Sequence, residues 1–95
     1  MLYALICTDK PGHLETRMNN RPAHVEWLES LRGALKAAGP FLGPDEKPAG
    51  SLVIIEAESL KAAEALANAD PYAKAGLFAH VDIRPWKWVF KNPEG

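Results

Sequence analysis

Apolar and polar positions divide the chain into segments with strand patterns and segments with helix patterns. Residues 2–7 and 51–57 are apolar at nearly every position, which is typical of strands buried on both faces. Residues 60–69 gather leucine and alanine on one helical face, and Ser59 before them is a favoured helix N-cap. Residues 78–90 alternate with the two-residue period of a strand. The hydrophobic pattern therefore predicts three strands and one short helix at these positions.

A longer helix is predicted between the first two of these strands, starting at residue 20 or 21 and ending near residue 38. Pro22 is tolerated in the first turn of a helix but not in its interior, and Gly39–Pro40 would stop the helix. Residues 13–19 would then form a looser or separate helical turn. At 100° per residue, the apolar stripe of this helix contains His24, Leu28, Leu31, Leu35 and Ala38. His24 is thus predicted at the centre of an otherwise apolar surface.

Turn-forming residues complete the pattern. Residues 40–44 are compatible with a short edge strand and residues 45–50 with a polar turn. Asp70–Pro71 resembles an N-cap followed by a first helical residue, and Gly76 would end that single turn. The order strand, helix, strand, strand, helix, strand can close as an α+β ferredoxin-like sandwich, a four-stranded antiparallel sheet with both helices on one face.

One domain is expected over residues 1–90, followed by a frayed tail over residues 91–95. The second face of its sheet has no cover within the chain, because two helices cover only one face. Residues 2–7 and 51–57 are nevertheless apolar on both faces, and the last strand places Trp86, Trp88 and Phe90 on one side together with Phe78, His80, Asp82 and Arg84. A second copy packed sheet to sheet would bury this face, so we expect a homodimer, or a higher oligomer built from it.

Composition restricts the partners and the cellular setting. The 95 residues carry a net charge of −1 with acids and bases interspersed, which argues against nucleic acid as a partner. Cys7 is the only cysteine and lies in an apolar run, which indicates a buried reduced thiol. The sequence has neither an apolar run of membrane-spanning length nor the pattern of a signal peptide. We therefore expect a cytoplasmic protein that does not bind membranes.

Motifs for a metal or a cofactor do not stand out. His13, His24 and His80 lack the spacing of metal ligands. There is no phosphate-binding glycine loop, no dinucleotide motif and no typical setting for a nucleophilic serine or cysteine. We expect no cofactor and no metal, and a metal site formed by His24, Asp70 and His80 is the weaker alternative.

His24 requires hydrogen-bond partners because it is predicted to lie among leucines. An unsatisfied buried nitrogen costs about 1–3 kcal/mol, and a carboxylate is the partner that best orients the ring. Asp9 and Asp45 are predicted in turns, and Asp82 lies in the middle of the last strand. Asp70 precedes that strand at a corner which, in a ferredoxin-like sandwich, can approach the early turns of the first helix. Asp70 is therefore the candidate partner.

Several motifs together resemble the YciI-like family over residues 1–90. They are TDKPG at 8–12, the R-x-x-x-R-x-x-H spacing of Arg17, Arg21 and His24, DPYAKAGLF at 70–78 and PWKWVF at 85–90. The resemblance implies a ferredoxin-like fold in the dimeric α+β barrel superfamily, which also includes muconolactone isomerases and cofactor-free monooxygenases. It also implies a His–Asp dyad, here His24 and Asp70, in a pocket of each subunit. One branch of the family removes chloride from chlorinated hydroxylated aromatics. The loop at 43–50 is short for the family, so the resemblance does not extend to the rim of the pocket.

The first class of function that these residues suggest is acid–base catalysis. A histidine held by a carboxylate can act as general base and then as general acid, as in an isomerase, a lyase or a dehydrohalogenase. Arg17 or Arg21 would hold a carboxylate or enolate oxygen, and Tyr72 would donate a hydrogen bond to the same oxygen. The substrate class is a small hydroxylated or anionic molecule, including aromatic ones.

The second class is a noncatalytic dimeric module that binds or senses a small molecule. In that case His24 is a satisfied core histidine, Asp70 is only a helix cap, and Arg17 and Arg21 pair with Glu15 or Glu26. An RNA-binding sandwich is less favoured, because the charge is neutral and the last strand is expected to be covered by a second copy. An enzyme should show a cavity beside the free nitrogen of the histidine, whereas a structural histidine should have both nitrogens satisfied.

Overall fold

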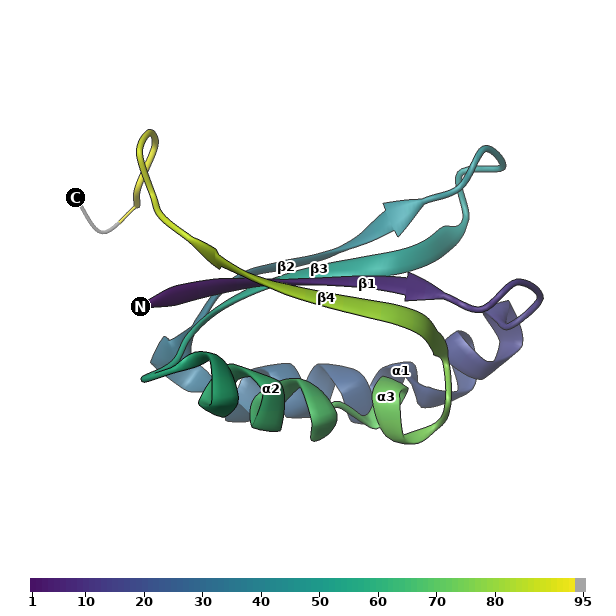
Figure 1. The fold of residues 1–95 in the computed structure, drawn as a ribbon. Coiled ribbons are helices and arrows are strands. Elements are labelled where there is room, and N and C mark those ends of the chain that lie inside the picture. The colour runs from purple at the N-terminus through teal and green to yellow at the C-terminus, as the bar shows by residue number, and fades with distance from the viewer. Residues whose placement is uncertain (94–95) are drawn as a thin grey trace.

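The computed structural model describes residues 1–93 and shows a four-stranded antiparallel sheet with its helices on one face (Figure 1). The strands are β1 (Leu2–Asp9), β2 (Leu35–Leu42), β3 (Pro48–Glu56) and β4 (Phe78–Trp86), in the spatial order β2-β3-β1-β4. The helices are α1 (Leu14–Ser30), α2 (Leu60–Asn68) and the single turn α3 (Pro71–Lys74), and a 3-10 turn, η1 (Arg32–Ala34), precedes β2. The predicted ferredoxin-like α+β fold is confirmed.

Helix α1 begins earlier than the hydrophobic pattern predicts. It starts at Leu14, so residues 13–19 do not form a separate turn, and Pro22 lies inside the helix. A proline in a helix removes the backbone donor for the carbonyl four residues earlier, here that of Met18. Both residues are exposed, so water can hydrate this carbonyl and the helix continues past the proline.

Helix α1 also ends earlier than predicted, at Ser30. Arg32 takes a left-handed backbone conformation with φ 50°, which turns the chain out of the helix and into β2. Leu35 and Ala38 therefore belong to the edge strand, and the prediction that they extend the helical stripe is wrong. Pairing with β3 decides their conformation, because the edge of β3 offers backbone hydrogen-bond partners to this segment.

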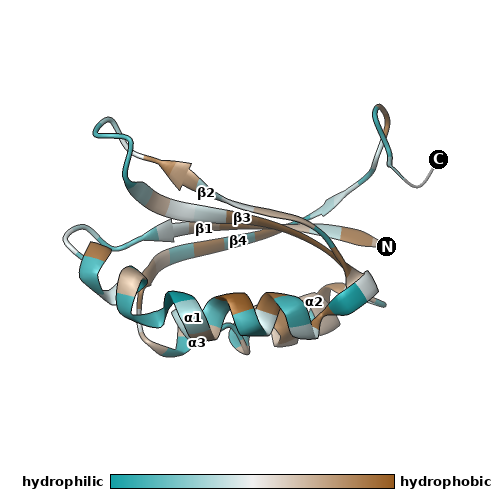
Figure 2. Cartoon of the chain, turned by 180° about the vertical axis from the view of Figure 1, so that it is seen from behind, coloured by the Kyte–Doolittle hydropathy of each residue, from teal (hydrophilic) through white to brown (hydrophobic). Residues whose placement is uncertain are grey.

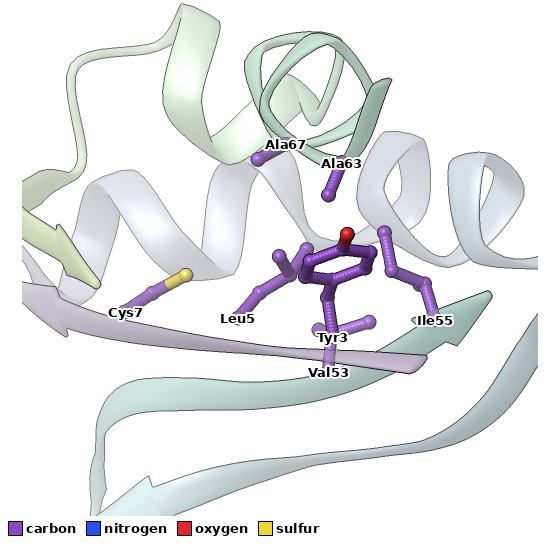
Figure 3. Close-up of a cluster of buried hydrophobic side chains, with 7 residues drawn as sticks. All are labelled: Tyr3, Leu5, Cys7, Val53, Ile55, Ala63 and Ala67. Atoms are coloured by element: carbon purple, nitrogen blue, oxygen red, sulfur yellow. The ribbon is translucent and has the colours of Figure 1, made fainter. Parts of the chain in front are cut away.

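The core lies between the sheet and the helices (Figure 3). Pairing places Leu5 of β1 opposite both Val53 and Ile83, so one parity of each central strand faces the helices. Leu28 of α1 and Leu31, the C-cap residue of that helix, pack against this core, which confirms this part of the predicted stripe. The buried members of the core cluster are Tyr3, Leu5, Cys7, Val53, Ile55, Ala63 and Ala67.

Strand β4 is shorter than predicted and contains an irregularity. It ends at Trp86, and residues 87–93 continue without helix or strand. The pairing with β1 shifts in register between Thr8 and Asp9, so that Phe78 packs against the core rather than sharing the outer face with His80. The extra residue of a β-bulge reverses the facing of the side chains that precede it. Of the predicted frayed tail, residues 94–95 lie outside the described residues, and the division at residue 90 stays a prediction.

The face of the sheet opposite the helices has no cover within residues 1–93 (Figure 1). It carries the other parity of the central strands, including Ala4, Ile6, Leu52 and Ile54, and brown segments mark hydrophobic residues on these strands (Figure 2). Phe41 of β2, which is opposite Gly50, lies on this face as well. Among the described residues, no helix is long and apolar enough to cross a bilayer.

Candidate functional site

A cavity of about 340 Å³ lies between α1 and the strands β2 and β3. Its polar lining consists of Arg17, Arg21, His24, Ser51 and Tyr72. The remaining wall is apolar and comes from α1, from residues 38–40 of β2 and from β3. A mostly apolar cavity of this size with a few converging polar groups is typical of a small-molecule site.

His24, which lines this cavity, contacts Asp70. The Nδ1 atom of His24 lies 2.8 Å from Oδ1 of Asp70, and both side chains are buried. Asp70 is the N-cap of α3, and the same Oδ1 accepts a hydrogen bond of 3.0 Å from the backbone N–H of Tyr72. The two side chains that the sequence pairs are therefore within hydrogen-bond reach, although 46 positions separate them.

This hydrogen bond assigns different roles to the two nitrogens of His24. An ionised carboxylate is an acceptor only, so Nδ1 carries the proton that Asp70 accepts. In residues 1–93, Asp70 is the ring's only hydrogen-bond partner, and no fully buried side-chain nitrogen or oxygen lacks one. The Nε2 atom is therefore not sealed in the protein, and His24 lines the cavity. A group bound there can exchange a proton with Nε2.

The ring of Tyr72 packs against one face of the His24 imidazole. The two rings are stacked, with centroids 3.9 Å apart and an interplanar angle of 13°. The guanidinium carbon of Arg17 lies 4.6 Å from the centre of the Tyr72 ring. Burial raises the pKa of the Tyr72 hydroxyl, and the nearby charges of Arg17 and Arg21 only partly oppose this effect. The phenol therefore stays protonated at neutral pH and can donate a hydrogen bond.

Arg17 is held by partners that the hydrophobic pattern does not reveal. Its Nε and Nη2 donate to the two carboxylate oxygens of Asp9 at 2.7 and 3.0 Å, and Nη2 also donates to Ser51 Oγ at 2.8 Å. Burial would lower the pKa of Arg17, but the hydrogen bond and charge of Asp9 outweigh this and raise it. The alternative pairing of Arg17 with Glu15 or Glu26 is wrong. Arg17 is thus a fixed, permanent positive charge in the cavity wall.

Sequence reasoning missed Asp9 and Ser51 because it treated Asp9 as a turn residue. Asp9 ends strand β1, and Ser51 is opposite Cys7 in the register. In the alternation of a strand, Asp9 and Cys7 point to the same face, as does the partner opposite Cys7. The two-residue period of the strands could therefore have predicted that Asp9 and Ser51 face the helices, where Arg17 contacts them.

Arg21 lies one helical turn from Arg17 at an exposed position, and it lines the cavity. Within the described part of the chain it has no hydrogen bond or ion pair, so pairing with Glu26 is not found. Its charge nevertheless acts on the hydroxyl of Tyr72, since it lowers the pKa of that group. Arg21 is the cation of the cavity that remains available to an anionic ligand.

The alternative metal site is not formed. His80 pairs with Thr8 and lies on the open face of the sheet, whereas His24 and Asp70 lie on the helix side. The weaker alternative of a site formed by His24, Asp70 and His80 is therefore excluded, because the sheet separates its members. Across residues 1–93, no group of three or more histidine, cysteine or acidic side chains is arranged to hold a metal ion.

Comparison with known proteins agrees with this fold. The family model of the YCII-related domain matches residues 1–87. The chain is 45% identical over 98 residues to Protein YciI of Escherichia coli O6:H1, an alignment that covers 95% of this chain and 100% of that protein. The chain belongs to the YciI family.

Two solved structures resemble this YciI-family chain to different degrees. The 5-chloro-2-hydroxyhydroquinone dehydrochlorinase of Burkholderia phenoliruptrix AC1100, in complex with 2,5-dihydroxybenzoquinone, is 38% identical with a TM-score of 0.85. The match covers 92% of this chain and 94% of that one. An antibiotic biosynthesis monooxygenase is 15% identical with a TM-score of 0.53, over 94% of this chain and 99% of that one. The second likeness concerns the fold alone.

Proposed function

We propose that this YciI-family protein is a cofactor-independent enzyme that uses His24 and Asp70 to transfer protons on a small hydroxylated or anionic aromatic or quinoid molecule. The reaction type is that of a dehydrohalogenase, a lyase or an isomerase. The observation that carries the proposal is the orientation of His24, whose Nδ1 is held by Asp70 while Nε2 is left to the cavity. A histidine with only a structural role would have both nitrogens satisfied by the protein.

The proton-transfer step follows from this arrangement. Neutral His24 takes a proton at Nε2 from a hydroxyl group of the substrate, and the carboxylate of Asp70 stabilises the imidazolium that results. The same nitrogen then returns the proton to a ring carbon. A positioned acid–base group of this kind contributes about 10²–10⁴-fold to the rate.

The positive side of the cavity would stabilise the oxyanion left by this step. Arg21 has no protein partner within residues 1–93, and Tyr72 carries a protonated hydroxyl, so both can donate to the oxygen. Arg17 contributes a fixed charge close to the same ring. The site therefore favours substrates that carry negative charge in the transition state.

The similarity to a dehydrochlorinase supports a specific version of this chemistry. A chlorinated hydroxyhydroquinone loses a hydroxyl proton to His24, and the carbon that bears chlorine receives a proton, which gives the ketone form. Loss of a second hydroxyl proton then expels chloride with the electron pair of its bond. The net change is loss of HCl and formation of a hydroxyquinone, so no external oxidant is needed.

The proposal is tested with 5-chloro-2-hydroxyhydroquinone under anaerobic conditions, following chloride release and quinone absorbance. His24→Gln should lower kcat by about 10²–10⁴-fold, whereas His13→Gln, the same change outside the cavity, should leave kcat unaltered. Titration with 2,5-dihydroxybenzoquinone measures occupancy of the cavity independently of turnover. Full turnover by His24→Gln would overturn the acid–base role. Binding without turnover by the wild-type chain would instead favour the noncatalytic binding module.

A further inference from the structure

The cavity beside His24 has room for more than one aromatic ring. A cavity of about 150 Å³ is enough to enclose a benzene molecule, whereas this cavity has a volume of about 340 Å³. A single hydroxylated ring of the kind proposed as substrate would therefore leave about half of the space to water. The distribution of polar and apolar side chains around the cavity indicates what fills the remaining space.

The polar groups of the cavity gather toward one end. The N-terminal end of α1 and the hairpin between β2 and β3 lie at the same end of the molecule (Figure 1). There Nη2 of Arg17 donates to Ser51 Oγ at 2.8 Å, which joins α1 to β3. Arg21 and His24 follow on the next turns of α1 and also line the cavity. We call this part of the cavity the polar end.

The other end of the cavity is apolar. Val53 follows Ser51 by two positions on β3, so both side chains face the helices, about 7 Å apart along the strand. Ala38 of β2 is opposite Val53 in the register. Leu28 lies one helical turn beyond His24 and packs against the core cluster that contains Val53. We call this part the apolar end, and the side chains that line it are Val25, Leu28, Ala38 and Val53.

The apolar end is open because Ala38 contributes only a methyl group at an exposed position of the edge strand. Water is a poor occupant of this end. A water molecule held in a cavity needs two to four polar partners, and the four apolar side chains offer none. An apolar group of a ligand that displaces such poorly held water gains affinity.

We propose that the ligand of this site has two parts. A hydroxylated or quinoid ring lies at the polar end, and an apolar substituent on that ring, an alkyl chain or a fused second ring, fills the apolar end. The ring part rests on the proposed function, whereas the apolar part follows from the size and lining of the cavity. Ala38 and Leu28 then determine the size of the substituent that is accepted. A ring without a substituent, such as 2,5-dihydroxybenzoquinone, occupies the polar end alone.

Calorimetric titration with a series of ligands tests this proposal. The series consists of 2,5-dihydroxybenzoquinone and its 3-methyl, 3-ethyl and 3-propyl derivatives, with the wild-type chain. Burial of one methylene group strengthens binding about fourfold, so Kd should fall by about this factor with each added carbon. A Kd that stays constant along the series, or rises with the added carbons, would overturn the two-part ligand.

A substitution at Ala38 tests where the gain arises. Ala38→Leu should fill the apolar end, so that it binds the unsubstituted ring as the wild type does but binds the propyl derivative no more tightly. Ala38→Val is a smaller change that suits a strand, and it should reduce the gain in part. Ala65→Leu, the same change at an exposed position of α2 outside the cavity, is the control and should keep the full series. A full gain from the propyl group in both Ala38 variants would exclude this location.

The titration measures binding and requires no turnover, so the two proposals can fail separately. Full turnover by His24→Gln would end the acid–base role and leave the increase in affinity along the series unaffected. A constant Kd along the series, together with loss of turnover in His24→Gln, would instead remove the apolar substituent and leave the proposed function intact.

Discussion

The carboxylate of Asp70 has two roles, the helix cap and the partner of His24, and two different substitutions at this position distinguish them. Its Oδ1 caps α3 through the N–H of Tyr72 and holds Nδ1 of His24. Asp70→Asn retains an oxygen that can cap the helix, since asparagine is as good an N-cap as aspartate. It removes the negative charge that stabilises a protonated His24. Asp70→Ala removes both the cap and the charge.

The burial of the pair determines the expected magnitudes. Loss of an N-cap costs about 1 kcal/mol, and a buried His24 nitrogen without an acceptor adds about 1–3 kcal/mol. Asp70→Ala should therefore lower the free energy of unfolding by about 2–4 kcal/mol. Asp70→Asn exchanges a charge-assisted hydrogen bond for a neutral one and should cost only about 1 kcal/mol. Both variants should lose about 10²–10⁴-fold in turnover, because the imidazolium lacks its carboxylate.

Urea unfolding at pH 7, followed by tryptophan fluorescence, measures the stability part, and chloride release measures turnover. Ser59→Ala is the matched control, since it removes the N-cap of α2 outside the cavity. It should lower stability by about 1 kcal/mol without changing turnover. Equal destabilisation by the asparagine and alanine variants, or wild-type turnover in the asparagine variant, would refute the separation of roles.

Three further predictions concern other positions. Gly50→Ala should destabilise the fold by about 1–3 kcal/mol in urea unfolding, because its Cβ would collide with the backbone oxygen of Cys7; Gly33→Ala, which meets open space, should stay within about 0.5 kcal/mol of wild type. Tyr72→Phe should keep the ring stacked on His24 but remove the donor hydroxyl; a loss of about tenfold or more in kcat/KM with unchanged stability is expected, and unchanged kcat/KM would exclude the donor role. Burial raises the pKa of the Cys7 thiol from 9.0 to about 12, so maleimide should label this thiol only after unfolding. Because the pKa is higher in the folded state than in the unfolded state, the contribution of the neutral thiol to the free energy of unfolding is present below pH 9. This contribution declines as the pH rises toward 12.

The parts of the candidate site that depend on local sequence pattern could be predicted from the sequence. The apolar stripe around His24 implied burial, and a buried histidine needs a partner, which left few acids to choose from. The Asp–Pro step indicated a cap at the start of α3, and the structure places this cap beside His24. Element types and their order followed from hydrophobic period and turn residues, because these depend on interactions between neighbours in the chain.

Tertiary structure alone decided the rest. Residues 35–38 fit a helical stripe as well as a strand, and the free edge of β3 made them a strand by supplying backbone hydrogen-bond partners. The partners of Arg17 are Asp9 on β1 and Ser51 on β3, which pairing of the two strands brings together. The bulge beside Thr8, which turns Phe78 inward, is also a property of paired strands. The local conformational preference of these segments differs little between helix and strand. Each buried polar group without a hydrogen-bond partner costs free energy, so pairing between distant segments determines which conformation forms.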